Sequence, residues 1–119
     1  AKQKTILVIE SDEALRKCLF EILSKEGYRV VSIRNNAEGL RALEAKDLPA
    51  MIFFDLVGPE LSDWNFLRQI RGNSRLEAVP IIISCGSLDE KTLELATSVI
   101  AKPYNMQTLL EVVERHSQP

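Results

Sequence analysis

The sequence predicts an α/β fold in which five strand–helix units form one parallel sheet covered by helices on both faces. Short apolar runs rich in β-branched residues alternate with segments that have apolar residues at helical spacing. Continuous apolar strands are typical of a sheet buried on both faces, and right-handed crossovers then give a doubly wound sandwich. The predicted strands span residues 5–10, 28–33, 51–55, 80–84 and 99–101.

Each predicted strand is followed by a segment with the features of a helix. Asp12 or Ser11 can cap the start of the first helix, and Gly27 follows its end. Asn35 and Asn105 are placed to cap the second and fifth helices. The apolar stripe of the first helix consists of Leu15, Cys18, Leu19, Ile22 and Leu23.

The third and fourth helices carry weaker signals. Ser62 or Asp63 is the predicted cap of the third helix, and residues 87–90 form a capping pattern for the fourth. The segment from 85 to 102 is short, so we expect the fourth helix to be shortened. The inward residues of the third helix are Phe66, Leu67 and Ile70.

Composition limits the classes of function. The chain has 119 residues, which suits a single domain over 1–119, and its net charge of −2 without a run of Lys or Arg disfavours direct binding of nucleic acid. Neither a membrane-spanning stretch nor a signal peptide is evident, and Cys18 and Cys85 lack metal-binding spacing, so we expect a cytoplasmic protein. The single histidine, His116, makes a histidine-dependent triad improbable.

Charged side chains follow three of the predicted strands. Glu10 ends the first, Asp55 ends the third and Lys102 comes directly after the fifth. In a sheet of order 2-1-3-4-5, the flavodoxin-like arrangement, the first and third strands are neighbours and ligands bind beyond their carboxyl ends. We therefore expect two carboxylates and one ammonium group to meet at one edge of the sheet.

This combination suits phosphoryl transfer to a carboxylate. Asp55 would be the nucleophile, Lys102 would be fixed by the turn at Pro103, a candidate cis bond, and Glu10 and Asp12 would offer oxygens to Mg²⁺. Simpler roles stay open: Asp55 as a strand terminator or cap, Lys102 as a surface lysine, and the two acids as partners of the helix N-terminus that follows.

Taken together, these motifs resemble the receiver domain of bacterial two-component response regulators. The similarity runs from Ile6 to about Glu114 and rests on four segments in the family's order. They are an acidic cluster after the first strand, an aspartate after the third, a hydrophobic fourth strand and a Lys-Pro turn. The segments lie at 6–12, 55–59, 79–85 and 102–104.

The resemblance assigns a role to each site residue. It implies that Asp55 accepts a phosphoryl group from a histidine kinase or a small phosphodonor, and that Lys102 contacts that group. Mg²⁺ would be bound by Asp55, by the backbone carbonyl of Val57 and through water by Glu10, with Ser11 as a weak neutral ligand. It implies self-phosphorylation and slow autodephosphorylation as the only enzymatic activities, with a kinase or another signalling protein as partner and a homodimer left open.

The chain also departs from the family pattern, and three of the departures bear on control by phosphorylation. Ser11 stands in place of an acid, Cys85 in place of a threonine or serine that turns toward the phosphoryl group, and Val99 in place of an aromatic residue. By this position Cys85 is a candidate catalytic residue beside Asp55 and Lys102, and a reactive thiol stays open, although no base is evident. A thiol is a poor hydrogen-bond donor, so we favour a small, mostly buried side chain. We therefore predict a receiver domain that acts through protein–protein contacts with weakened control by phosphorylation.

The sequence also leaves open a receiver that is fully controlled by phosphorylation, which would need Glu10 and Asp12 to hold Mg²⁺ despite Ser11. Three further alternatives remain. The first is an interaction module of the pseudo-receiver kind that is independent of phosphorylation. The second is an aspartyl-phosphate hydrolase, although such enzymes have an acid two residues after the nucleophile, where this chain has Val57. The third is a flavin carrier, which is disfavoured because the loop at 10–13 is acidic where a phosphate cradle needs glycine.

Overall fold

The computed structural model describes residues 3–56, 60–87 and 90–117. Strands and helices alternate strictly, and the five strands form one parallel sheet of order β2-β1-β3-β4-β5. The predicted fold class and strand order are therefore confirmed. The strands are β1 Thr5–Ile9, β2 Arg29–Ile33, β3 Met51–Leu56, β4 Ile81–Cys85 and β5 Ser98–Ala101. The helices are α1 Glu13–Lys25, α2 Asn36–Leu43, α3 Leu61–Arg71, α4 Glu90–Leu95 and α5 Met106–Ser117.

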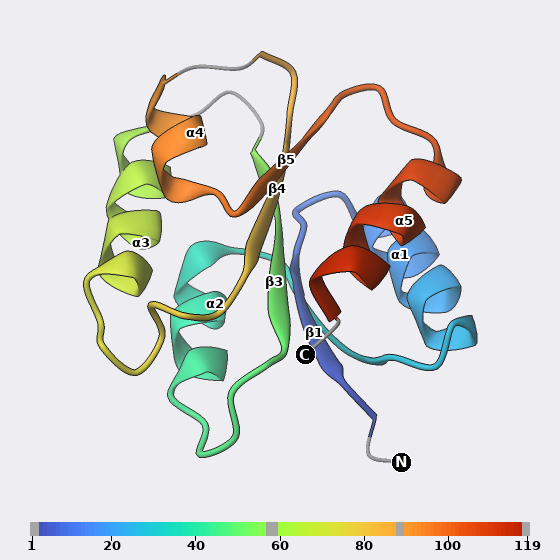
Figure 1. Cartoon of the computed structure of the whole chain (residues 1–119), viewed down its shortest axis with the longest axis horizontal. Coiled ribbons are helices and arrows are strands. Elements are labelled where there is room, and N and C mark those ends of the chain that lie inside the picture. The colour runs from blue at the N-terminus through green and yellow to red at the C-terminus, as the bar shows by residue number, and fades with distance from the viewer. Residues whose placement is uncertain (1–2, 57–59, 88–89, 118–119) are drawn as a thin grey trace.

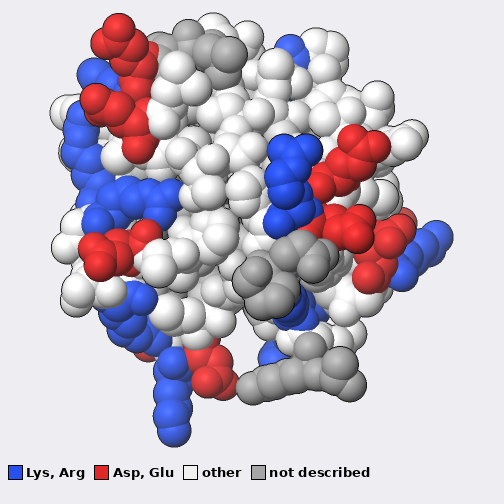
Figure 2. All heavy atoms as spheres, in the orientation of Figure 1, with Lys and Arg blue, Asp and Glu red and all other residues white. Residues whose placement is uncertain are grey.

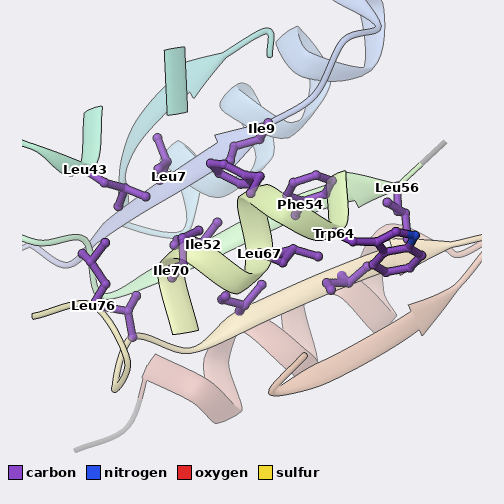
Figure 3. Packing of buried hydrophobic residues seen from close by; sticks show 14 of the residues in the cluster. Leu7, Ile9, Leu43, Ile52, Phe54, Leu56, Trp64, Leu67, Ile70 and Leu76 are labelled. Atoms are coloured by element: carbon purple, nitrogen blue, oxygen red, sulfur yellow. The ribbon is translucent and has the colours of Figure 1, made fainter. Parts of the chain in front are cut away.

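The helices cover the two faces of the sheet unequally. Helices α1 and α5 lie on one face, and α2, α3 and α4 lie on the other (Figure 1). Strand alternation divides the core accordingly, because neighbouring residues of a strand point to opposite faces. Phe53 belongs to the cluster under α1 and α5, whereas Phe54 belongs to the cluster under α2 and α3. Figure 3 shows the second cluster, with Trp64 of α3 at the end where Leu56 lies.

Side-chain caps set the starts of the helices. Asp12 caps α1, Asn35 caps α2, and Asn105 Oδ1 accepts the Thr108 N–H at 2.8 Å, as predicted. The predicted cap of α3 was wrong. Glu60 is the cap of that helix, in a capping box where Asp63 Oδ2 accepts the Glu60 N–H. The acid at the third helical position is thus the reciprocal partner of the cap.

The end of α1 and the length of α4 also agree with the sequence. Gly27 has a φ of 94°, a conformation that glycine adopts without strain, where the chain leaves α1. Helix α4 has six residues, as the short segment before β5 predicts. The capping residues Leu88 and Asp89 lie outside the described residues.

Charged side chains of both signs are interspersed over the face that Figure 2 shows. This distribution agrees with the small net charge of −2. No helix in the described part of the chain is long and apolar enough to span a membrane.

Candidate phosphoacceptor site

The centre of the site is the carboxylate of Asp55, near the end of β3. Its side chain is 3% exposed, and Lys102 Nζ lies 2.5 Å from Asp55 Oδ1. The hydroxyl of Ser84 donates a hydrogen bond to the same oxygen at 2.8 Å. An ammonium group and a hydroxyl therefore stabilise one oxygen of a nearly buried carboxylate.

Lys102 reaches Asp55 from a strand that does not pair with β3. Strand β4 lies between β3 and β5, and the Lys102 N–H donates to the Cys85 carbonyl at the end of β4. The Lys102–Pro103 peptide bond is cis, as expected. Lys102 Nζ also lies 3.5 Å from the Leu56 carbonyl, so the ammonium group sits at the carboxyl end of β3.

Glu10 supplies the second carboxylate of the site. Its side chain is buried at 1% exposure, and Glu10 Oε2 accepts the Asp12 N–H at 3.0 Å. Glu10 Oε1 has no hydrogen-bond partner among the described residues, although it is also buried. Burial raises the pKa of Glu10 to about 7, and the negative charge of Asp55 contributes to this rise.

The two carboxylates suit a divalent cation in their chemistry. Mg²⁺ is bound in proteins by one or two carboxylates together with several waters. The buried and unpaired Glu10 Oε1 is an oxygen that a cation would satisfy, and Asp55 is close enough to Glu10 to affect its pKa. These two residues could therefore hold the ion.

The rest of the predicted cation site is less complete. Asp12 Oδ1 accepts the Leu15 N–H at 2.8 Å, so this acid caps α1. Ser11 is exposed and lines the pocket next to Asp55. Val57, whose carbonyl was expected to join the ion, lies outside the described residues. Among the residues described, no group of three or more His, Cys, Asp or Glu side chains is arranged to hold a metal.

A pocket opens beside the two carboxylates, between α1 and the start of α5. Its volume is about 960 Å³, and Leu15, Tyr104 and Met106 form much of its apolar wall. The Tyr104 hydroxyl is buried and lacks a hydrogen-bond partner among the described residues. Burial and the nearby carboxylates raise its pKa to about 12, so Tyr104 stays a neutral phenol at the pocket wall.

Cys85 and its neighbour Ser84 point to opposite faces of the sheet. Cys85 is 2% exposed and packs in the core cluster under α2 and α3, which confirms a small buried side chain. Ser84 pairs with Asp55 in the register of β3 and β4, so both side chains point to the α1 and α5 face. Sequence reasoning missed Ser84, although strand alternation from Asp55 and the parallel register would have placed it there.

The chain belongs to the response regulator receiver domain family, whose model matches residues 6–114. The transcriptional regulatory protein GltR of Pseudomonas aeruginosa is 30% identical over 115 residues, which cover 92% of this chain and 47% of GltR. This chain thus spans about half the length of that relative. PilH from the same organism is 26% identical over 114 residues, covering 91% of this chain and 93% of PilH. The predicted resemblance is confirmed.

Solved structures support the same assignment. The receiver domain of a signal transduction histidine kinase from Syntrophus aciditrophicus is 28% identical, with a TM-score of 0.85 over 96% of this chain and 89% of that one. The receiver domain of the sensor kinase PA1611 from Pseudomonas aeruginosa has a TM-score of 0.82 at 22% identity over 98% of each chain, and its structure holds a magnesium ion in the active-site cleft. This chain is therefore a receiver domain of two-component signalling. Receiver domains as a family bind Mg²⁺ and interact with histidine kinases and other signalling proteins.

Proposed function

We propose that Asp55 accepts a phosphoryl group from a histidine kinase or from a small acyl phosphate. The contact of Lys102 Nζ with Asp55 Oδ1 at 2.5 Å is the observation that supports this proposal most strongly. The two residues come from β3 and from the end of β5, so the fold itself joins the nucleophile to a fixed positive charge. A nearly buried carboxylate with such a partner suits phosphoryl transfer, which depends mainly on positioning and charge neutralisation.

The donors on Oδ1 leave Oδ2 as the attacking atom. Oδ2 forms a bond to phosphorus while the P–N bond of phosphohistidine, or the P–O bond of an acyl phosphate, breaks. The leaving group takes the electron pair of the broken bond, and an acyl phosphate remains on Asp55. Lys102 keeps a positive charge beside the carboxylate and the incoming phosphoryl oxygens throughout.

Glu10 and Asp55 are the residues that would hold Mg²⁺ in this reaction. The ion, when bound, supplies charge neutralisation on the phosphoryl oxygens. Because Asp12 caps α1 and Ser11 is neutral, few charged ligands remain for the ion, and fewer charged ligands mean weaker binding. We therefore propose that phosphorylation needs high Mg²⁺ and that control by phosphorylation is weak.

Intact mass spectrometry of the chain after incubation with Mg²⁺ and acetyl phosphate tests the proposal. We expect a single phosphoryl adduct on the wild type and none on Asp55→Asn. Asp12→Asn is the matched control, because it also replaces an acid by its amide near the site while asparagine still caps α1. It should form the adduct like the wild type.

A folded wild type without an adduct would contradict the phosphoacceptor role. The favoured function would then be an interaction module of the pseudo-receiver kind, which is supported by the neutral Ser11 and by the placement of Cys85 in the core. In either case, we propose that the partner is a histidine kinase or another signalling protein.

A further inference from the structure

Ser84 is a buried hydroxyl next to the phosphoacceptor. Its side chain is 0% exposed, and its hydroxyl donates to Asp55 Oδ1 at 2.8 Å. The hydroxyl lies in the interior of the sheet, because β4 pairs with β3 on one side and with β5 on the other. Ser84 therefore contacts Asp55 before any phosphoryl group arrives.

The position of Ser84 distinguishes this site from the one that the family pattern leads one to expect. The hydroxyl residue of the family falls on position 85, where this chain has a cysteine that packs on the opposite face of the sheet. Ser84 is one residue earlier in β4 and pairs with Asp55 in the parallel register, so its side chain points to the same face. In this chain the hydroxyl group therefore lies at the residue that pairs with the carboxylate.

We propose that Ser84 is a positioning residue that acts through Asp55 Oδ1 and shortens the lifetime of the acyl phosphate. This inference rests on the proposed phosphoacceptor function. It differs from the expected family arrangement, in which a hydroxyl turns toward the phosphoryl group, because here the hydroxyl contacts the carboxylate oxygen.

The direction of the effect follows from the charge on Oδ1. In the acyl phosphate, Oδ2 is bonded to phosphorus and Oδ1 is a neutral carbonyl oxygen. During hydrolysis, water attacks phosphorus, the bond from Oδ2 to phosphorus breaks, and its electron pair returns to the carboxylate as inorganic phosphate leaves. A hydrogen bond to a carboxylate is stronger than one to a neutral carbonyl, so Ser84 stabilises the transition state more than the acyl phosphate.

Removal of the hydroxyl should therefore slow hydrolysis. We expect the half-life of the adduct to increase about threefold to tenfold in Ser84→Ala, in line with the difference between a charged and a neutral hydrogen bond. Formation of the adduct should not be slower in Ser84→Ala, because the hydrogen bond from Ser84 stabilises the charged carboxylate of the reactant and its loss does not raise the barrier to attack. Ser84→Thr keeps a hydroxyl at this position and should restore the wild-type half-life.

The experiment follows the decay of the adduct by intact mass after removal of acetyl phosphate. Ser32→Ala is the matched control, because Ser32 is also a strand serine and its buried hydroxyl has no hydrogen-bond partner among the described residues. It should leave the half-life unchanged. Thermal unfolding of each variant separates an effect on the adduct from an effect on the fold.

The outcomes distinguish this inference from the proposed function. No adduct on the wild type would overturn both. An adduct on the wild type whose half-life is the same or shorter in Ser84→Ala would overturn the role of Ser84 alone. A longer half-life in Ser84→Ala that Ser84→Thr fails to reverse would show a packing effect and would also overturn it.

Discussion

The proposed acceptor half and the proposed cation half of the site differ in how many of their side chains contact one another. The acceptor half consists of Asp55, Ser84 and Lys102, and both donors converge on Asp55 Oδ1 within 2.8 Å. The cation half consists of Glu10, Ser11 and Asp12, of which only Glu10 is a buried acid without a full set of partners. The acceptor half is held by three strands, whereas the cation half is a short segment whose second acid caps a helix.

This difference follows from what holds each half in place. The contacts of Asp55 come from β4 and from the residue after β5, so the packing of the sheet maintains them. The segment at 10–12 depends instead on side-chain identity at consecutive positions, where one substitution removes a charge. Substitutions at Lys102, Glu10, Ser11 and Asp12 test this difference.

Loss of the lysine should disable the acceptor half. Lys102→Met removes the positive charge beside Asp55 Oδ1 and leaves Ser84 as the donor there. We expect adduct formation from acetyl phosphate to slow by about 100-fold, a usual cost of removing an electrostatic stabiliser. Intact mass as a function of time measures the rate. A rate within threefold of the wild type would show that the ion pair has no role in the reaction.

Loss of the buried acid should change the pH dependence of stability. Glu10 has a pKa of about 7 in the folded chain, whereas the ordinary value is 4.5. Between pH 4.5 and pH 7 the carboxyl group is therefore protonated in the folded state and ionised in the unfolded state. The stability of the wild type should therefore fall as pH rises from 4.5 to 7 and then level off. Glu10→Gln cannot ionise and should be more stable than the wild type at pH 8, by roughly 3 kcal/mol.

Urea unfolding without Mg²⁺ at pH 5 and pH 8 measures this effect. The difference between Glu10→Gln and the wild type should be larger at pH 8 than at pH 5. Asp12→Asn is the control, because Asp12 is exposed and the asparagine that replaces it can still cap α1. An equal difference at both pH values would show that Glu10 ionises normally in the folded chain.

Addition of an acid should complete the cation half. Ser11→Asp places a second carboxylate beside Glu10 and should tighten Mg²⁺ binding by about tenfold, because affinity rises with the number of charged ligands. Isothermal titration calorimetry measures the affinity. Ser11→Asn, in which asparagine has the size of aspartate but no charge, should bind Mg²⁺ with the affinity of the wild type. Equal affinities of Ser11→Asp and Ser11→Asn would mean that position 11 does not face the ion.

Removal of the helix cap should have the smallest effect. Asp12→Ala loses the hydrogen bond to the Leu15 N–H and should lower the free energy of unfolding by about 1 kcal/mol. The Mg²⁺ affinity of Asp12→Ala should change little, because the carboxylate of Asp12 caps α1. Urea unfolding and calorimetry measure the two quantities. A large loss of affinity with unchanged stability would instead identify Asp12 as a ligand of the ion.

The fold and the candidate acceptor residue could be predicted from the sequence because their signals are local. The periods of apolar residues predicted five strand–helix units, and Asp55, Glu10 and Lys102 were identified because each follows an apolar strand. The prediction of the cap of α3 was wrong because the true cap, Glu60, is followed closely by Ser62 and Asp63, which can also cap a helix. Capping signals that overlap along the chain are resolved only by the backbone angles at the start of the helix.

The sequence by itself determined the order of the elements, the candidate acceptor aspartate at the end of β3, the Lys-Pro turn and the shortened α4. Only the tertiary structure decided that Ser84 contacts Asp55 while Cys85 packs in the core on the other face of the sheet, and that Asp12 caps α1 while Glu10 is buried. The physical reason is that composition and periodicity are properties of neighbouring residues. The partner of a side chain depends instead on the register of strands that are 29 residues apart, as Asp55 and Ser84 are.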